Sequence, residues 1–158
     1  MLYDERLSVP LRWWVQATMM VASAWLATIV SLPEPAAWAV TAVVAALISA
    51  FFFSYGGARV RVTEQWFQAG AARIELVHLG TSTPLDPEAS RRLAGVDADA
   101  RAYLLLRPYL KRSVRVDLVD PADPTPYWQV STRHPEALAR ALDEAMVSLN
   151  QTHLTQED

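Results

Sequence analysis

Three aspartates in the C-terminal half of the chain are the first candidates for metal chemistry. Asp117, Asp120 and Asp123 recur at every third position, beside Pro121 and Pro124. Carboxylate oxygens are the ligands that a hard divalent cation such as Ca²⁺ prefers. However, the segment lacks the glycine that a calcium-binding loop of the EF-hand type requires, and aspartate beside proline is typical of turns. We therefore expect solvated acids that stiffen a loop, and we predict no metal site here.

The histidines and hydroxyls form no recognisable catalytic pattern. His78, His134 and His153 are scattered, and none lies in an H-x-x-x-H or H-E-x-x-H arrangement. Ser131 lies close to His134, but no nucleophile elbow surrounds this serine. The chain has no cysteine, which excludes thiolate catalysis, disulfides and cysteine-bound zinc. We predict no catalytic residue and no cofactor, and we do not expect an enzyme.

Basic residues gather in one predicted β-hairpin and could bind anions. They are Arg107, Lys111, Arg112 and Arg115. Such a group attracts anionic lipid headgroups, at about 1 kcal/mol for each charge near the surface. It could also contact a protein partner, or be an ordinary charged turn. The formal net charge of the whole chain is −3, which gives no indication of a nucleic-acid partner.

Two long apolar runs in the first third of the chain determine where these groups would act. Residues 13–32 and 36–55 contain no charged side chain, and only a Pro-Glu-Pro sequence at 33–35 separates them. A helix of about 20 residues is about 30 Å long, which matches the hydrocarbon core of a bilayer. Proline ends the first helix and begins the second, so we predict antiparallel transmembrane helices at about residues 11–32 and 36–55. The rest of the chain is too small to enclose two such helices in a soluble core.

Aromatic and basic residues lie at the ends of these predicted helices. Trp and Tyr favour the boundary between lipid and water, so we assign the role of membrane-interface anchor to Arg12, Trp13, Trp14, Trp38, Phe53 and Tyr55. Arginine precedes the first helix and follows the second, whereas the 33–35 turn has neither Lys nor Arg. The preference of positive charge for the cytoplasmic side predicts a multi-pass plasma-membrane protein with two helices and both termini in the cytoplasm.

The remainder of the chain has the alternation of a β-rich domain. We predict an N-terminal segment with the hairpin at residues 1–57, a cytoplasmic domain at 58–150 and a polar tail at 151–158. The predicted strands are residues 59–63, 66–69, 73–79, 101–110, 113–120 and 127–133, with a loop or short helix over 80–100. A helix should follow Pro135, with an apolar stripe of Leu138, Ala141, Leu142, Ala145, Met146 and Leu149. The predicted fold class is α+β, with a transmembrane hairpin followed by a small antiparallel β-barrel or sandwich that the last helix closes.

Two resemblances follow from these features. Strands followed by one helix resemble a pleckstrin-homology-like (PH-like) domain, which bacterial proteins often join to a pair of membrane helices. The segments YDERLSVPLRWW, RVRVTEQWF, RAYLLLRPYLKRSVRVDL and DPADPTPYWQVSTRHPEAL are similar to an actinobacterial family of two-helix membrane proteins, domain of unknown function 3093. The likeness extends from about residue 3 to residue 142. It implies an actinobacterial plasma membrane, but it carries no activity and no functional residue.

Together these features predict a protein that acts by binding at a lipid bilayer. We expect a non-catalytic scaffold or accessory subunit that recruits a protein partner or associates with itself, because PH-like domains offer sheet edges and a groove beside the last helix. One alternative is a sensor of anionic lipid headgroups that uses the basic hairpin. Another is a subunit of an oligomeric membrane enzyme or transporter, although neither apolar run contains an ionisable residue.

Overall fold

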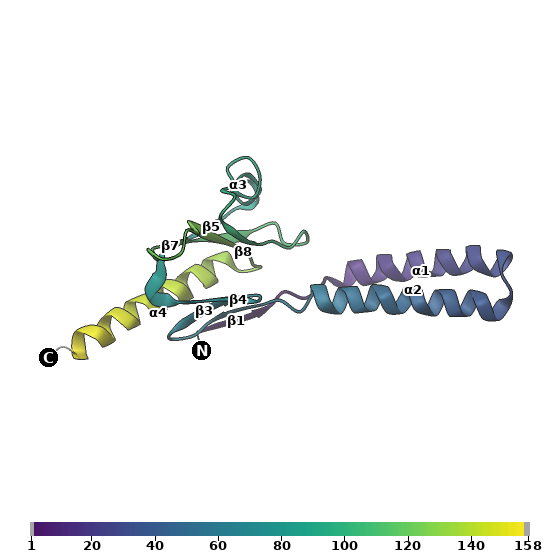
Figure 1. Ribbon diagram of the computed structural model, residues 1–158, viewed down its shortest axis with the longest axis horizontal. Helices are drawn as coiled ribbons and strands as arrows, with labels where there is room; N and C mark the ends of the chain where they lie inside the picture. Colours follow the sequence, from purple (N-terminus) through teal and green to yellow (C-terminus); the bar gives the residue numbers. More distant parts are fainter. Residues whose placement is uncertain (1, 157–158) are drawn as a thin grey trace. The chain divides into compact units, whose positions relative to one another are not determined.

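The computed structural model describes residues 2–156, with the side chains of all of these except positions 55, 150 and 152–156. The chain forms two compact units. Residues 8–57 form a pair of long helices, and residues 1–7 together with 58–158 form a unit rich in strands (Figure 1). These units are called the helical hairpin and the β-rich unit below.

The helical hairpin consists of two antiparallel helices, α1 (Leu11–Ser31) and α2 (Glu34–Tyr55). Pro35 lies in the first turn of α2, where the missing N–H costs no helical hydrogen bond. Only Leu32 and Pro33 connect the two helices, so the observed boundaries lie within two residues of the predicted ones. So short a connection requires the two helices to be neighbours.

The first sheet of the β-rich unit begins with a strand that the sequence analysis did not predict. Its strands in spatial order are β1 (Tyr3–Arg6), β2 (Arg59–Val62), β3 (Trp66–Ala69) and β4 (Ala72–Glu75), all antiparallel. Arg6 pairs with Arg59, and the N–H of Leu7 donates to the carbonyl of Ala58 at 2.9 Å. The helical hairpin is therefore an insertion between two neighbouring strands. Residues 1–7 lie with the β-rich unit, whereas the predicted boundary grouped them with the hairpin.

The second sheet contains, in spatial order, β5 (Leu79–Leu85), β7 (Ser113–Leu118), β8 (Tyr127–Ser131) and β6 (Tyr103–Leu105). Strand β6 is parallel to β8, so the sheet is mixed, and the prediction of antiparallel strands alone was wrong. The strand pairs of the described residues fall into two separate sheets, so the predicted barrel is not closed. A barrel needs continuous pairing around its circumference, and a 3₁₀ turn at Leu76–His78 separates β4 from β5 instead.

Strand β5 lies largely within residues 80–100, which were predicted as a loop or short helix. Its sequence LGTSTPL has little apolar alternation, and Pro84 has no N–H to donate. The strand occupies an edge of its sheet and pairs with an irregular register, and proline is tolerated in such a place. The short helix α3 (Pro87–Leu93) follows after Asp86, whose carboxylate accepts two backbone N–H groups at its start.

Both sheets and the last helix, α4 (Pro135–Gln156), share one hydrophobic core. Phe67 from the first sheet lies against Trp128 from the second, with ring centroids 5.7 Å apart. Leu138 and Leu142, from the predicted stripe of α4, are fully buried in this core. The α+β class is confirmed, with two apolar helices that precede two sheets and a covering helix.

Candidate functional site

The helical hairpin exposes most of the large apolar side chains found on the surface of the described residues. These are Leu11, Val15, Met19, Met20, Leu26, Val30, Leu32, Trp38, Val40, Val43, Leu47, Phe51 and Phe53. Each helix contains a 21-residue candidate membrane span. Only 6% of the most apolar stretch of each span is buried. A helix of this length measures about 31 Å. By length and composition, both helices are able to cross a membrane.

Five hydroxyl groups of the helical hairpin are satisfied within their own helices. The hydroxyls of Thr18, Ser23, Ser31 and Thr41 donate to the carbonyl four residues earlier at 2.8–3.2 Å, and that of Thr28 to the carbonyl three residues earlier at 3.0 Å. Internal bonds of this kind are required in hydrocarbon, where water offers no alternative partner. The hydroxyls therefore do not interrupt an apolar surface.

The predicted interface anchors form two aromatic groups in the helical hairpin. Near one end, the Trp14 ring lies 5.0 Å from Phe52 and 5.6 Å from Phe53, measured between centroids. Nearer the turn, Trp25 and Trp38 lie 5.5 Å apart. The first group lies where α1 begins and α2 ends, whereas the second joins Trp25, within α1, to Trp38 near the start of α2. Of the other predicted anchors, Trp13 lies 6.3 Å from Phe52, Arg12 is exposed, and the side chain of Tyr55 lies outside the described residues.

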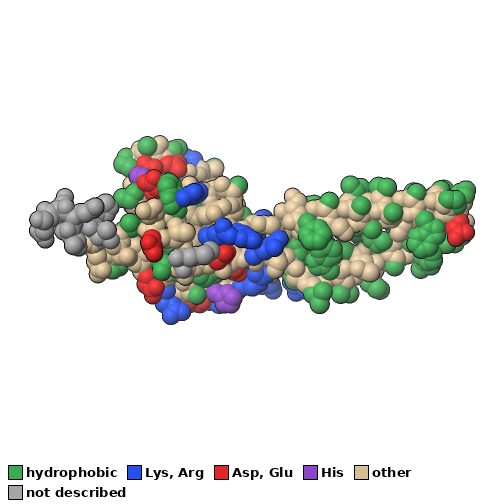
Figure 2. Space-filling model, turned by 90° about the horizontal axis from the view of Figure 1, so that it is seen from below, with side chains coloured by type: hydrophobic (Ala, Val, Ile, Leu, Met, Phe, Trp, Pro, Cys, Tyr) green, Lys and Arg blue, Asp and Glu red, His purple; other side chains and the backbone are tan. Residues whose placement is uncertain are grey.

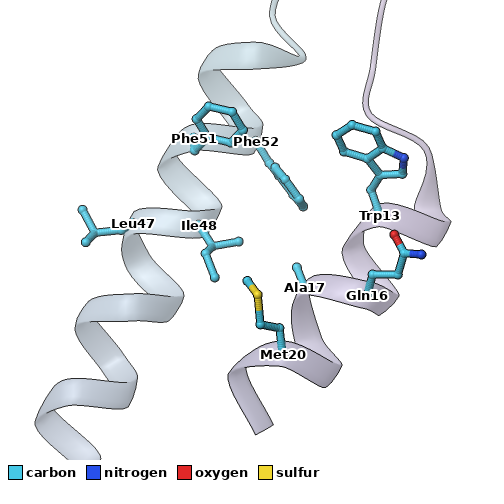
Figure 3. A pocket seen from close by; sticks show the side chains of 8 residues that line it. All are labelled: Trp13, Gln16, Ala17, Met20, Leu47, Ile48, Phe51 and Phe52. Atoms are coloured by element: carbon cyan, nitrogen blue, oxygen red, sulfur yellow. The ribbon is translucent and has the colours of Figure 1, made fainter. Parts of the chain in front are cut away.

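A pocket of about 450 Å³ lies between the two helices (Figure 3). Ala17 and Met20 from α1 and Ile48 and Phe52 from α2 point into it, and Gln16 is the one lining residue with a polar side chain. Such a lining suits hydrocarbon and contains no group able to act as an acid, a base or a nucleophile.

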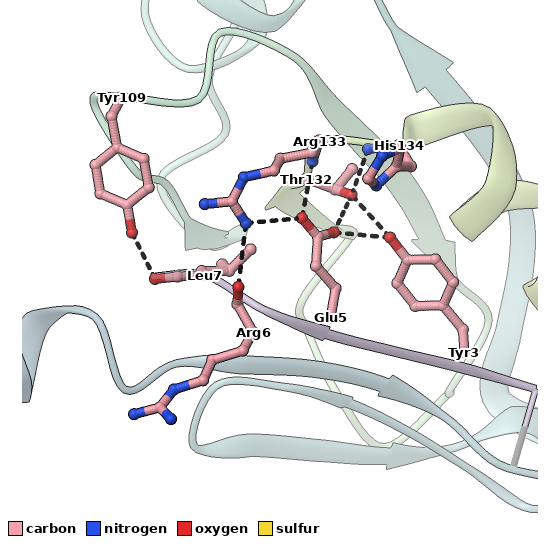
Figure 4. A network of polar contacts seen from close by, with 8 residues as sticks. All are labelled: Tyr3, Glu5, Arg6, Leu7, Tyr109, Thr132, Arg133 and His134. Carbon is pink, nitrogen blue, oxygen red and sulfur yellow. Dashed lines mark hydrogen bonds and ion pairs between the residues drawn. The ribbon is translucent and has the colours of Figure 1, made fainter. Parts of the chain in front are cut away.

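A buried carboxylate organises the β-rich unit next to the point where the chain leaves for the hairpin. Glu5 on β1 accepts hydrogen bonds from the hydroxyls of Tyr3 at 2.7 Å and Thr132 at 2.5 Å (Figure 4). It also accepts from the backbone N–H of Arg133 at 3.1 Å and from its guanidinium at 3.4 Å. We call these four residues the polar latch. Since Thr132 and Arg133 lie between β8 and α4, the polar latch joins the first sheet to the second.

The carboxylate at the centre of the polar latch is nearly closed to solvent. Glu5 is 9% exposed and Thr132 only 1%, and the hydroxyls of Tyr3 and Thr132 also contact each other at 3.1 Å. Burial raises the pKa of Tyr3 well above its ordinary value, so its hydroxyl stays protonated. A buried carboxylate is tolerated only where donors surround it, and these donors meet that requirement.

Two further hydrogen bonds hold the last residues before the hairpin. The guanidinium of Arg133 donates to the carbonyl of Arg6 at 3.1 Å. The hydroxyl of Tyr109 donates to the carbonyl of Leu7 at 2.6 Å, and the side chain of Leu7 is fully buried (Figure 4). The chain is thus anchored up to the residue that precedes Ser8, where the helical hairpin begins.

The basic residues predicted to form one hairpin do not do so. Strands β6 and β7 are not neighbours, because β8 lies between them, so residues 106–112 cross over rather than turn. Arg112 forms an ion pair with Glu136, and Arg115 forms one with Asp117 and stacks on Tyr127 at 4.5 Å. The N–H of Arg107 donates to Ser131 at 3.1 Å. Of these four residues, Lys111 is exposed and forms no ion pair with the residues that the structure describes.

The other candidates have local roles. The carboxylates of Asp120 and Asp123 accept from backbone N–H groups two residues ahead, at 2.8 and 2.9 Å, which is the predicted stiffening of a loop. Within the described residues no three His, Cys, Asp or Glu side chains form a group that could hold a metal. His78 lies half-buried in the 3₁₀ turn, His134 is exposed before α4, and the side chain of His153 lies outside the described residues.

The polar latch and the partners of β1 were not predicted from the sequence. One signal was present, because Tyr3, Glu5 and Leu7 alternate with Asp4 and Arg6 as in a strand. The partner of Glu5 lies 127 residues away in the sequence, and no local pattern reveals it.

These features define a small α+β protein with two helices that are long and apolar enough to span a membrane. The chain belongs to the family described as protein of unknown function (DUF3093), whose model matches residues 2–142. The match includes β1, both apolar helices, both sheets and the first part of α4. Neither the curated proteins nor the solved structures contain a significant match to the chain.

Removal of the Glu5 carboxylate should destabilise the β-rich unit. We expect Glu5→Ala to lower the free energy of unfolding by about 2–4 kcal/mol, because it leaves buried donors of Tyr3, Thr132 and Arg133 without an acceptor. The matched control is Asp4→Ala on the same strand, which breaks only the partly exposed ion pair with Arg61 at 3.3 Å and should cost at most about 1 kcal/mol. Denaturant unfolding of the full chain measures both. Equal losses of unfolding free energy in the two variants would contradict the role assigned to the polar latch.

Proposed function

We propose that this chain is an integral membrane protein whose hairpin crosses the plasma membrane twice. Both termini and the β-rich unit lie in the cytoplasm. The β-rich unit acts as a PH-like binding domain, and the protein serves as a non-catalytic scaffold or accessory subunit that recruits a protein partner to the membrane.

One observation carries the membrane part of this proposal. Two apolar helices, each with a single charged residue in its first turn, are inserted between β1 and β2, which are neighbouring strands of one sheet. Both ends of the insertion therefore emerge from the same folded unit, which requires that unit and both termini to occupy one side of the bilayer. The orientation is supported by Arg6, Arg12 and Arg59 near the open end of the hairpin, against Glu34 alone at its turn.

The binding part of the proposal rests on an open sheet edge beside a groove. Strand β4 is an edge of the first sheet, so its outer backbone groups can accept an extended peptide. A pocket of about 390 Å³ beside it is lined by Trp66, Glu75, Val77 and Leu149, the last from α4. Val77 is 61% exposed although it is apolar. An added peptide strand could place an apolar side chain in this pocket.

Membrane insertion is tested by single cysteines, because the chain has none of its own. The full-length variants are Glu34→Cys at the start of α2, Ala42→Cys on an exposed face of α2, and Ala122→Cys in the loop after β7. In intact cells a membrane-impermeant maleimide should label Glu34→Cys at once and Ala122→Cys only after lysis. Ala42→Cys should react only in denaturing detergent, because lipid covers it.

Two outcomes of this labelling would contradict the proposal. Reaction of Ala42→Cys in lysed cells without detergent would mean that water, not lipid, surrounds the exposed face of α2. Reaction of Ala122→Cys in intact cells would place the β-rich unit outside the cell.

Recruitment of a partner is tested by photo-crosslinking from the groove. A photoreactive residue in place of Val77 should capture one abundant protein in cells. The matched control replaces Val96, which is 94% exposed but does not line this groove. Capture of no protein from position 77, or of the same proteins from both positions, would contradict recruitment at this edge.

A further inference from the structure

Two arginines face each other across the first sheet, and neither forms an ion pair with another described residue. Arg6 on β1 and Arg59 on β2 are directly paired, and both side chains are exposed on the face opposite the core. Like charges placed directly opposite each other destabilise a sheet. The next pair along the same face, Asp4 and Arg61, has opposite charges and forms an ion pair at 3.3 Å. The sheet therefore neutralises one pair and leaves the pair nearer the hairpin positive.

The arrangement contrasts with that of four other arginines of the β-rich unit. Ion pairs join Arg92 to Asp97, Arg101 to Asp99, Arg112 to Glu136 and Arg115 to Asp117. Within the described part of the chain, no carboxylate lies at ion-pair distance from Arg6, Arg59 or Lys111. The nearest acid along β1, Glu5, points to the core and is occupied by the polar latch.

The crossover segment brings a third cation to the same end of the unit. The bond from Tyr109 to the carbonyl of Leu7 holds residues 107–112 beside the end of β1. Lys111 follows two residues later and is exposed. Figure 2 shows Lys and Arg side chains gathered toward one end of the β-rich unit.

Chain length limits how far these cations can lie from the proposed membrane. Arg59 follows the last residue of α2, Tyr55, by four positions, and Arg6 precedes the first residue of α1, Leu11, by five. Fully extended chains of those lengths span at most about 14 and 18 Å. The negative potential of an anionic leaflet acts over about 8–10 Å, and the polar headgroups themselves occupy about 5–7 Å of each leaflet. Both arginines are thus confined to within about 18 Å of the helix ends, a range that the headgroups and the negative potential of the leaflet largely cover.

We propose that Arg6, Arg59 and Lys111 form a binding site for the headgroup phosphates of anionic phospholipids in the bilayer that holds the hairpin. This inference rests on the proposed membrane insertion. Guanidinium groups suit phosphate because they donate two parallel hydrogen bonds. A bound phosphate removes the repulsion between Arg6 and Arg59, so anionic lipid strengthens the pairing of β1 with β2.

The experiment compares the full-length protein in nanodiscs of phosphatidylcholine with nanodiscs that also contain phosphatidylglycerol. Lipids that remain bound are counted by native mass spectrometry. The wild type should retain phosphatidylglycerol selectively. The double variant R6Q/R59Q should lose this preference on the order of thirtyfold, since each of the two removed charges contributes about a factor of five near the surface. The matched control R91Q/R140Q removes the same charge from two other exposed arginines and should retain the preference.

Thermal unfolding gives a second readout that does not depend on lipid counting. In phosphatidylcholine alone, R59Q should unfold about 1–5 °C above the wild type, because it relieves the repulsion of a cross-strand like-charge pair. In phosphatidylglycerol the order should reverse, because the wild type gains a ligand that R59Q binds weakly. If R59Q unfolds above the wild type in both lipids, or below it in both, the proposal is overturned.

The outcomes separate this inference from the membrane proposal. Equal phosphatidylglycerol retention by wild type and R6Q/R59Q in correctly inserted protein would overturn the lipid site and leave insertion intact. Failure of every variant to enter nanodiscs, with soluble folded protein instead, would overturn insertion and the lipid site together.

Discussion

The pairing of β1 with β2 is the interaction on which the rest of the molecule depends. A four-residue strand before the helical hairpin forms an antiparallel ladder with the strand directly after it, from Tyr3 opposite Val62 to Arg6 opposite Arg59. This ladder makes the hairpin an insertion and places the N-terminal strand and α4 in one folded unit. It also brings two arginines together at the point where the chain leaves that unit.

A four-residue edge strand is weak alone, and two features compensate. The first is the polar latch, which bonds Glu5 to the segment between the second sheet and α4. The second is the hairpin itself. A flexible loop of about 50 residues would cost about 3–4 kcal/mol of closure entropy. Antiparallel packing of α1 on α2 already brings the ends of the insertion together, as the contact of Trp14 with Phe52 at 5.0 Å shows. A Cβ on Gly56 would lie 3.2 Å from the side chain of Val9. The glycine at position 56 therefore allows the two ends of the insertion to lie close together.

The elements that could be predicted from the sequence are those with a strong local signal. The charge-free runs indicated α1 and α2 within two residues, and the apolar stripe indicated α4. The elements that were missed or misplaced depend on distant partners. Strand β1 has only four residues and pairs with a strand more than 50 positions later. Strand β5 contains Pro84 and forms only as an edge, and the parallel direction of β6 arises from a crossover. The predicted basic group was dispersed because Arg112 and Arg115 each have a separate acidic partner.

We expect the β-rich unit to fold by itself, without the core of the helical hairpin. Independent folding is tested most directly by replacing residues 8–57 with Asn-Gly. Leu7 and Ala58, which are already hydrogen-bonded, would then flank a two-residue turn of the type that closes β-hairpins. The shortened protein should be soluble without detergent and should unfold cooperatively on heating. A shortened protein that aggregates, or that unfolds without a cooperative transition, would show that the hairpin is part of the domain core and would contradict independent folding of the β-rich unit.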